Sequence, residues 1–481
     1  MRMIDMERIV RITGLTVDNF KSIKRGSIKF SSKNDFEFGN ILGLYGQNGS
    51  GKTAIVQAIE VLQMVLNGEG FPTNVDNVIN IDSQTCKLKF YFEMDLLERN
   101  FNGFFEIKIV RDEENFMYIS SETIQYKRDI RKEKSKGYEP NIKRTYEQKI
   151  SYTCDNPEFL FLSTSQNKHQ TSSFSLKNAS DEARGNLIAA RKLTTKDRIS
   201  FLLEDSVVTL LPDEFREIII HLKKKISLNT FVVTNENLGL IYTDLMLPLN
   251  FFLEKKNKSG ITYGRTGIPG RLNSSSQDNS IVIPTESYET ICNIFKQTNE
   301  VLPKIIPNLT VSLEEIGTQT LESGKQGTRI QFIANRTGKK PLPFSYESDG
   351  VKKITSVLSL LTAMFNDPNV FVVIDELDAA IYEYLLGDVV KILNNHGRGQ
   401  LLFTSHNLRV LEVLGVENIM VTTTNEMNRF IHLKDIKETN NLRRVYLRAI
   451  QLGGQDEAIY EETDSFDIQR AFKRAGEIGF K

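Results

Sequence analysis

The residues with the clearest capacity for chemistry form a glycine-rich stretch, 46–53 (GQNGSGKT), which fits the phosphate-binding pattern G-x-x-x-x-G-K-[ST] without a mismatch. The apolar residues 41–45 before it predict a short buried strand, and residues 54–62 after it predict a helix. In such a turn, backbone N–H groups and the positive end of the helix dipole attract phosphate oxygens. The stretch therefore predicts a site for the phosphates of a nucleotide.

Particular side chains of this stretch have separate expected roles. Lys52 is expected to reach the β and γ oxygens, and Thr53 is expected to ligate Mg²⁺. The other residues expected to surround the phosphates are Gly46, Asn48, Gly49, Ser50 and Gly51. The expected cofactors are ATP and Mg²⁺.

A second candidate site follows an apolar run, 370–374, that ends in Asp375 and Glu376. Five unbroken apolar residues are typical of a strand buried on both faces of a parallel sheet. The carboxyl end of such a strand is where ligands bind in open α/β sheets. Asp375 is expected to hold Mg²⁺ through water, and Glu376 to orient and deprotonate the attacking water.

Two more segments carry candidate residues. Residues 401–406 (LLFTSH) predict another buried strand, and a neutral His406 at its end can hydrogen-bond the γ-phosphate or the attacking water. Ser348 precedes an apolar helix and suits an N-cap. As an ATPase signature, its hydroxyl, the Gly350 backbone and the helix dipole would instead face the γ-phosphate of a nucleotide held by a second subunit.

The order of these motifs, with Asp378 just after the Asp-Glu pair, resembles the ABC-type ATPase heads of the structural-maintenance, RecF and overcoming-lysogenization-defect (OLD) families. Residues 15–23 (LTVDNFKSI) look like the first strand of those heads, and the resemblance places Asn19 and Lys21 near the nucleotide. It implies an α/β fold: a P-loop ABC-type head with a mixed sheet and an antiparallel subdomain. The helical spacing of apolar residues at 187–203 and 213–226 adds the expectation that a compact, mostly helical insertion interrupts this head.

Within that group, residues 345–353 (SYESDGVKK) and 374–380 (IDELDAA) look closest to bacterial abortive-infection ATPases of the AbiL type and to the ATPase subunits of PARIS and Septu. The matching segments cover roughly 10–65 and 340–435. The signature departs from the Leu-Ser-Gly-Gly-Gln of transporters, because Glu-Ser-Asp-Gly-Val stands here. For the glutamine that joins the two half-domains in such heads, Gln84 and Gln166 are both candidates.

This resemblance implies an ATP-binding and hydrolysing sensor or switch subunit of an anti-phage system, acting through ATP-dependent head dimerisation. Its expected partners are a second copy of the chain and a separately encoded effector, a TOPRIM or HNH nuclease or a toxin. A phage protein or a nucleic acid is the expected trigger. The alternatives are a DNA repair or recombination ATPase of the RecF or structural-maintenance type, and an ABC-type translation factor, which the single phosphate loop disfavours.

The amino-acid composition limits these hypotheses on function. The 481 residues include 61 Lys+Arg and 61 Asp+Glu, so net charge gives no signal for nucleic acid. Three widely spaced cysteines predict neither a disulfide framework nor a zinc site and favour the cytoplasm. No run of about 18 apolar residues predicts a membrane span. The five histidines lack ligand spacing, and the stretch after His406 is short for a TOPRIM domain, so we expect an ATPase without its own effector.

The expected organisation has three parts: residues 1–174 as the N-terminal half of the head, 175–335 as the helical insertion, and 336–481 as the C-terminal half with a tail. No sustained heptad pattern predicts a coiled-coil arm in the insertion. The insertion is expected to hold the partner or trigger. Basic residues at 127–144 and 255–271 are either nucleic-acid or acidic-protein contacts, or solvated loops.

Overall fold

The computed structural model describes most of the chain. The described residues are 9–30, 38–71, 78–96, 99–113, 116–130, 145–154, 161–165, 181–234, 244–249, 252–257, 260–265, 268–273, 280–285, 288–320, 324, 326–434 and 441–478. Gln166 and residues 131–144, most of the first predicted basic stretch, lie outside them.

The helices and strands fall into two groups along the chain. In the first half they are β1 (Ile9–Phe20), β2 (Ile23–Lys29), β3 (Asn40–Tyr45), α1 (Lys52–Asn67), β4 (Thr85–Leu96), β5 (Arg99–Arg111), β6 (Met117–Ile130), β7 (Thr145–Thr153), β8 (Phe161–Ser165), α2 (Asp181–Asp197), α3 (Asp205–Val208), α4 (Asp213–His221) with a π-helical continuation (Leu222–Ser227), and β9 (Thr230–Val233). In the second half they are β10 (Asp244–Leu249), β11 (Phe252–Asn257), β12 (Gly260–Arg265), β13 (Ile268–Asn273), β14 (Ser280–Pro284), α6 (Tyr288–Ile305), β15 (Leu309–Thr320), β16 (Gln326–Arg336), β17 (Leu342–Pro343), α7 (Asp349–Asn366), β18 (Phe371–Ile374), α8 (Glu383–His396), β19 (Gln400–Thr404), β20 (Ile419–Thr422), β21 (Phe430–Ile431), α9 (Leu442–Leu452) and α10 (Ser465–Ile478).

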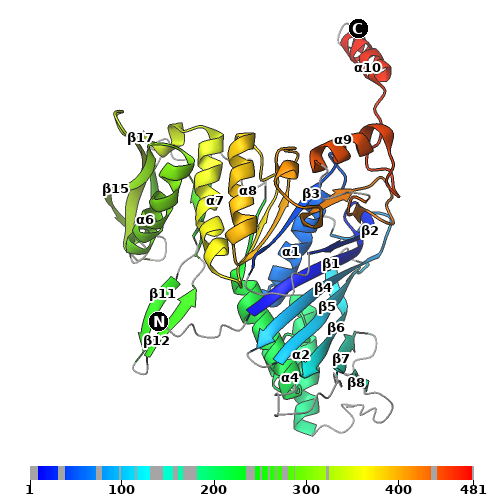
Figure 1. Ribbon diagram of the computed structural model, residues 1–481. Helices are drawn as coiled ribbons and strands as arrows, with labels where there is room; N and C mark the ends of the chain where they lie inside the picture. The colour runs from blue at the N-terminus through cyan, green and yellow to red at the C-terminus, as the bar shows by residue number, and fades with distance from the viewer. Residues whose placement is uncertain are drawn as a thin grey trace, which may run out of the picture.

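A sheet of six strands among the described residues, in the order β21-β20-β3-β19-β18-β9, forms the centre of the molecule (Figure 1). Its strands run parallel except for the edge strand β21, so the predicted mixed sheet is confirmed. The apolar run of β18 is buried throughout, because both faces of the sheet are covered. The carboxyl ends of β3, β18 and β19 therefore meet at one edge.

Alternate side chains of the central strands enter two different cores. Val373 and Leu402 pack in the core that contains α1 and the antiparallel sheet, and Val372 and Leu401 pack in the core that contains α7 and α8. This alternation is the period of two expected of a strand. The α1 helix, which follows the phosphate loop, therefore covers one face of the central sheet, and α7, which follows Ser348, covers the other face.

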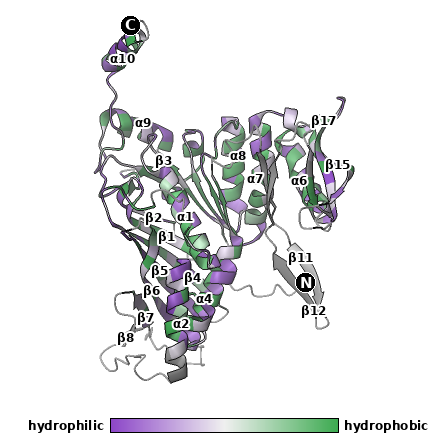
Figure 2. Cartoon of the chain, turned by 180° about the vertical axis from the view of Figure 1, so that it is seen from behind, coloured by the Kyte–Doolittle hydropathy of each residue, from purple (hydrophilic) through white to green (hydrophobic). Residues whose placement is uncertain are grey.

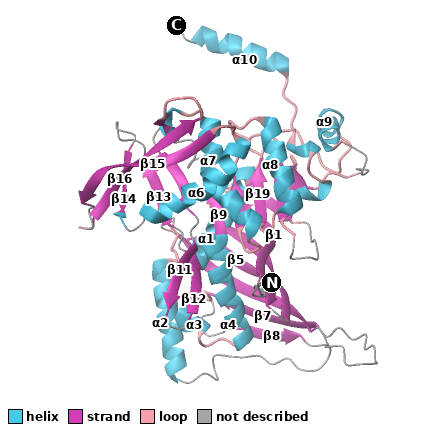
Figure 3. Cartoon of the chain, turned by 60° about the vertical axis from the view of Figure 1, so that its left-hand side comes forward, coloured by secondary structure: helices cyan, strands magenta, loops and turns pink. Residues whose placement is uncertain are grey.

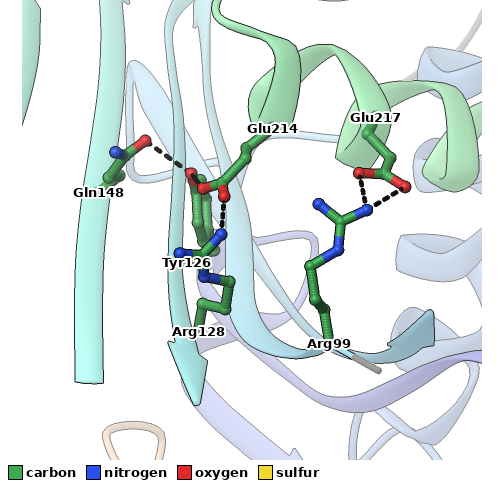
Figure 4. A network of polar contacts seen from close by, with 6 residues as sticks. All are labelled: Arg99, Tyr126, Arg128, Gln148, Glu214 and Glu217. Atoms are coloured by element: carbon green, nitrogen blue, oxygen red, sulfur yellow. Dashed lines mark hydrogen bonds and ion pairs between the residues drawn. The ribbon is translucent and has the colours of Figure 1, made fainter. Parts of the chain in front are cut away.

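A second sheet of seven described strands, in the order β2-β1-β4-β5-β6-β7-β8, is antiparallel, which confirms the predicted antiparallel subdomain. The α2 and α4 helices lie beside it (Figure 3). Polar side chains join the sheet to α4 (Figure 4): Arg99 pairs with Glu217 at 2.9 Å, and Arg128 pairs with Glu214. Arg128 belongs to the first predicted basic stretch, and its charge is matched here by a carboxylate.

Glu122 on β6 ties the helical segment to this sheet. Its carboxylate is 1% exposed and accepts hydrogen bonds from the Ser200 hydroxyl and from the backbone N–H groups of Phe201 at 2.8 Å and Leu202 at 3.0 Å. Burial raises the pKa of Glu122, and these three donors oppose that rise.

Replacing Glu122 with Ala is expected to lower the free energy of unfolding by roughly 2–5 kcal/mol, because three buried donors lose their acceptor together. The measurement is urea unfolding followed by circular dichroism. The matched control is Glu106→Ala on β5 of the same sheet, whose ion pairs are partly exposed, so a change within about 0.5 kcal/mol is expected. Equal effects of the two substitutions would contradict the role given to Glu122.

The segment predicted as a mostly helical insertion, 175–335, has a different content. Helices fill its first part, but β9 to β16 follow, and only α6 interrupts these described strands. The β9 strand belongs to the central sheet, because Thr230–Val233 pairs in parallel with β18. The second predicted basic stretch, 255–271, overlaps β11, β12 and β13, of which β11 pairs with β12 and β13 pairs with β10. An alternation of polar and apolar residues over so few positions is hard to distinguish from a polar loop. This explains why these strands were not predicted.

The segment before α10 contacts the phosphate loop, and α10 itself extends away from the head. The Glu461 N–H donates to the Gln47 side chain at 3.1 Å. The α10 helix then stands apart from the rest (Figure 1), and its hydropathy is mixed (Figure 2). None of its residues is buried against the other described residues. Within the described ranges, no helix is long and apolar enough to cross a membrane.

Candidate functional site

The phosphate loop is shaped by glycines that no other residue could replace without strain. Gly46 has φ 151°, and a Cβ there would lie 1.7 Å from the Thr422 hydroxyl. Gly51 has φ 93°, and a Cβ there would lie 2.8 Å from the Ile23 side chain. Positive φ favours glycine, so the loop conformation and its close neighbours select the same residue. The loop runs directly into the N-terminus of α1 at Lys52.

Lys52 lies buried in the loop, with 7% of its surface exposed. Its ammonium donates to the backbone carbonyls of Gly46 and Gln47, both at 2.9 Å. Burial lowers the pKa of Lys52, and the negative charges of Asp375, Glu376 and Asp378 oppose this shift. The structure therefore brings the lysine of the loop and the carboxylates after β18 into one electrostatic site.

Thr404, the last residue of β19, fixes both acidic residues after β18. Its hydroxyl donates to Asp375 Oδ1 and accepts the Glu376 N–H at 2.7 Å. Its carbonyl accepts the Leu377 N–H at 2.9 Å. One threonine thus fixes the carboxylate of the expected metal ligand and the backbone of the expected base. Sequence reasoning missed Thr404; the only local signal is its position at the end of a buried strand.

Glu376 has an unusual backbone, with φ 46°. Such a conformation is uncommon for residues other than glycine and clusters at functional sites. Lys353 on α7 donates through Nζ to the Glu376 carbonyl, although Lys353 is 2% exposed. Burial lowers the pKa of Lys353 to about 8, against the effect of Asp378, Glu376 and Asp375. Lys353 was also missed as a site residue, since it reads as one polar position on an apolar helix.

His406 and Asp378 meet beyond the ends of β18 and β19. The His406 backbone N–H donates to Asp378 Oδ2 at 3.0 Å. Burial lowers the pKa of the His406 imidazole, and the positive charge of Lys52 lowers it further, while nearby carboxylates oppose this. A neutral imidazole is the form expected to hydrogen-bond a phosphate oxygen or water.

Ser348 occupies the N-cap position of α7, as predicted, but within the described chain its side chain makes no capping hydrogen bond and is exposed. A Cβ at Gly350 would lie 1.9 Å from the Ala380 carbonyl oxygen. The first turn of α7 therefore contacts the loop that follows Glu376, and Ser348 stays open to another molecule.

The Asn19 and Lys21 segment forms a tight turn between β1 and β2. Both residues have positive φ, 52° and 50°. Asn80 fixes the turn, because its N–H donates to the Asn19 carbonyl at 2.8 Å and its side-chain amide donates to the Lys21 carbonyl at 2.6 Å. Ile23, just after this turn, packs against Gly51, which places the turn beside the phosphate loop. Direct contact of Asn19 or Lys21 with a nucleotide stays a prediction.

The residues present fit Mg²⁺ held together with a triphosphate. Thr53 is exposed at the start of α1, and Asp375 is buried with one oxygen fixed by Thr404. Among the described residues, no group of three or more His, Cys, Asp or Glu side chains could hold a metal alone. Mg²⁺ commonly takes one or two protein ligands, waters and substrate phosphates, so this sparse set suits it. The Gln84 carbonyl accepts a hydrogen bond from the Arg111 N–H, and the choice between Gln84 and Gln166 as the glutamine that joins the two half-domains stays a prediction.

Comparison with known proteins gives one sequence match. The family model described as AAA ATPase domain matches residues 11–410. No curated protein matches the sequence.

The chain is also similar to solved structures. One is the SmcHead bound to the C-winged helix domain of ScpA, with 14% identity, TM-score 0.37, and coverage of 88% of this chain and 98% of that one. A second is the SMC head domain from Thermotoga maritima, with 13% identity, TM-score 0.34, and coverage of 88% and 99%. A third is the recombination mediator protein RecF-ATPrS, with 11% identity, TM-score 0.36, and coverage of 88% and 98%.

The family match runs from the third residue of β1 to four residues beyond His406, and so includes the phosphate loop, α7 and the carboxylates after β18. The predicted fold class is thereby confirmed as an α/β P-loop ATPase head. The chain belongs to the AAA ATPase domain family and is an ATPase.

Proposed function

We propose that this chain hydrolyses ATP at the shared carboxyl edge of β3, β18 and β19, and that hydrolysis is completed by a second copy of the chain. The observation that carries the proposal is that β3, β19 and β18 pair in parallel, so that the phosphate loop with Lys52 and the carboxylates Asp375 and Glu376 follow strands that end at the same edge of the sheet. Lys52 is far from the two carboxylates in the sequence, and no packing requirement explains two adjacent carboxylates beside a buried lysine.

Each side chain has a proposed role that its position supports. Lys52 leaves the loop carbonyls to hold the β and γ oxygens, and the loop N–H groups surround the phosphates. Thr53 and Asp375 would hold Mg²⁺, which neutralises charge on the phosphates when it is bound. Glu376 orients the attacking water and accepts its proton. His406 hydrogen-bonds the γ-phosphate or that water through its neutral imidazole.

A second subunit closes the site on the side of the γ-phosphate. Ser348 is exposed at the N-terminus of α7, where a hydroxyl, backbone N–H groups and the helix dipole can meet an anion. In a two-fold dimer, Ser348 and Gly350 of each copy would face the γ-phosphate held by the other, and Asp378 would lie at the boundary. Two ATP molecules would then be enclosed per dimer.

Mixing two inactive variants tests this arrangement. Lys52→Ala removes the phosphate ligand, and Ser348→Arg blocks the signature, so each variant alone should be inactive. An equal mixture should regain about a quarter of wild-type turnover, because half of the dimers are mixed and each has one intact site of two. The measurement is phosphate release. Absence of recovery, with subunit exchange shown by pull-down of differently tagged copies, would exclude the trans site.

We further propose that this ATPase is the sensor or switch subunit of a bacterial anti-phage system that controls a separately encoded nuclease or toxin. The sequence resemblance at 345–353 and 374–380 supports this role. The segment 175–335 is the proposed partner or trigger region, and its β9 strand contacts the site directly, since the Asp375 N–H donates to the Val233 carbonyl at 2.8 Å. A partner that moves this segment would thus act on the strand that bears Asp375.

Co-purification with the product of a neighbouring effector gene tests the defence role, beside a DNA mobility shift over a salt series. Retention of the effector with no DNA shift supports the switch function. DNA binding that weakens steeply with salt supports the repair or recombination alternative instead, because each phosphate contact releases counterions. Of the first basic stretch, Lys127 pairs with Glu147 and Arg128 with Glu214, which favours the first outcome.

A further inference from the structure

Lys353 is a buried lysine whose position needs an explanation beyond packing. It is 2% exposed on the face of α7 that also buries Ile354, Val357 and Leu361. Lysine is almost never fully buried unless its charge is paired. Its ammonium donates to the Glu376 carbonyl and experiences the favourable charges of Asp378, Glu376 and Asp375. The charge is therefore directed at the loop that carries the expected base.

The backbone of Glu376 is held from both sides. Its N–H donates to Thr404, and its carbonyl accepts hydrogen bonds from Lys353 and from the Ala379 N–H at 2.9 Å. A residue other than glycine at φ 46° is strained and persists only when its surroundings impose the conformation. Thr404 imposes it from the central sheet, and Lys353 imposes it from α7.

A second contact joins α7 to the same loop. Gly350 lies so close to the Ala380 carbonyl that a Cβ would be only 1.9 Å from it, and Ala380 itself has φ 62°. The loop 376–380 therefore contacts the N-terminal part of α7 at its start, through the hydrogen bond from Lys353, and at its end, through the close approach of Gly350. Ser348 lies two residues before Gly350, so a displacement of the exposed helix end reaches the loop at both points.

We propose that Lys353 is a positioning residue that ties the orientation of Glu376 to the position of the signature end of α7. Glu376 is aligned for proton transfer when Ser348 and Gly350 engage the nucleotide of the second subunit, and it is misaligned otherwise. The inference rests on the proposed function, since it takes Glu376 as the base and Ser348 as the trans contact. Lys353 acts on the turnover step and leaves the phosphate loop unchanged.

Lys353→Met tests this role, because methionine matches the length of the lysine stem and suits an apolar helix face. We expect kcat to fall by about tenfold to a hundredfold, as for a small displacement of a catalytic group. The KM for ATP and the affinity for a non-hydrolysable ATP analogue should stay within about twofold, because the phosphate ligands are intact. The Tm should change little, because the cost of burying the ammonium and its attraction to the nearby carboxylates oppose each other and both are removed.

Two further variants sharpen the result. Lys353→Gln keeps a donor for the Glu376 carbonyl without the charge, so its kcat should fall between those of the wild type and Lys353→Met. The control Lys391→Met removes an exposed lysine from α8 and should leave kcat and KM unchanged. Both quantities come from phosphate release at varied ATP concentration.

The outcomes separate this inference from the proposed function. If Glu376→Gln abolishes turnover while Lys353→Met keeps the wild-type kcat, the positioning role is overturned and the base assignment stands. If Glu376→Gln leaves turnover unchanged, the base assignment itself fails. If both Lys353 variants lose analogue binding and Tm together with kcat, Lys353 is a structural residue only, and the inference is equally overturned.

Discussion

Replacing Glu376 with Gln is expected to lower ATP turnover by about 10²–10⁴-fold, because the water loses its proton acceptor. The amide keeps the size of the side chain, and the backbone bonds of Glu376 to Thr404 and Lys353 do not involve the carboxylate. The variant should therefore still bind ATP and retain it. Phosphate release measures the first effect, and retention of labelled ATP after gel filtration measures the second.

A matched control for this substitution is Glu300→Gln, which changes an exposed glutamate on α6. Its turnover should equal that of the wild type. Wild-type turnover in Glu376→Gln would show that another group activates the water. Loss of ATP binding together with turnover would show that Glu376 serves the nucleotide pocket rather than the chemical step.

Lys52→Ala is expected to weaken ATP binding by about 10–100-fold, since charge-assisted hydrogen bonds to the phosphates contribute roughly 1.5–3 kcal/mol. The loop itself should keep its shape, because Gly46 and Gly51 set its conformation through positive φ and close contacts. Isothermal calorimetry with an ATP analogue and Mg²⁺ gives the affinity, and thermal unfolding without nucleotide gives the stability. Lys304→Ala, an exposed lysine on α6, is the control. An unchanged affinity in Lys52→Ala would remove Lys52 from the phosphate site.

The parts of this molecule that sequence predicted well are those specified by local signals. The phosphate loop is encoded by residues at fixed spacing, and the strands beside it are short apolar runs that parallel sheets require. Ser348 was placed correctly at the start of α7 because N-cap preferences are local. Whether Ser348 and Asp378 touch a nucleotide stays a prediction, as do the roles of the other candidate residues.

The parts that sequence did not predict depend on pairing between distant segments. Thr404 acts on Asp375 and Glu376 only because β19 pairs in register with β18, Phe403 opposite Ile374. Lys353 gains its role from the packing of α7 against the loop after β18. The β9 strand, Thr230–Val233, is four residues long and follows a π-helix, so no local pattern assigns it to the central sheet. The same long-range pairing replaced the expected helical insertion with a mixture of helices and strands.

The pairing of β3 has a consequence for how the protein is made. Leu42 pairs with Leu402 and Gly43 pairs with Ile419, so both neighbours of β3 are synthesised long after the phosphate loop itself. During translation, the antiparallel strands can pair as they emerge, whereas both edges of the apolar strand β3 stay unpaired until β19 and β20 are synthesised. Contacts this distant in sequence make folding slow and leave intermediates prone to aggregation. A competent nucleotide pocket therefore appears only when nearly the whole head has been synthesised, and nucleotide binding reports that folding is complete.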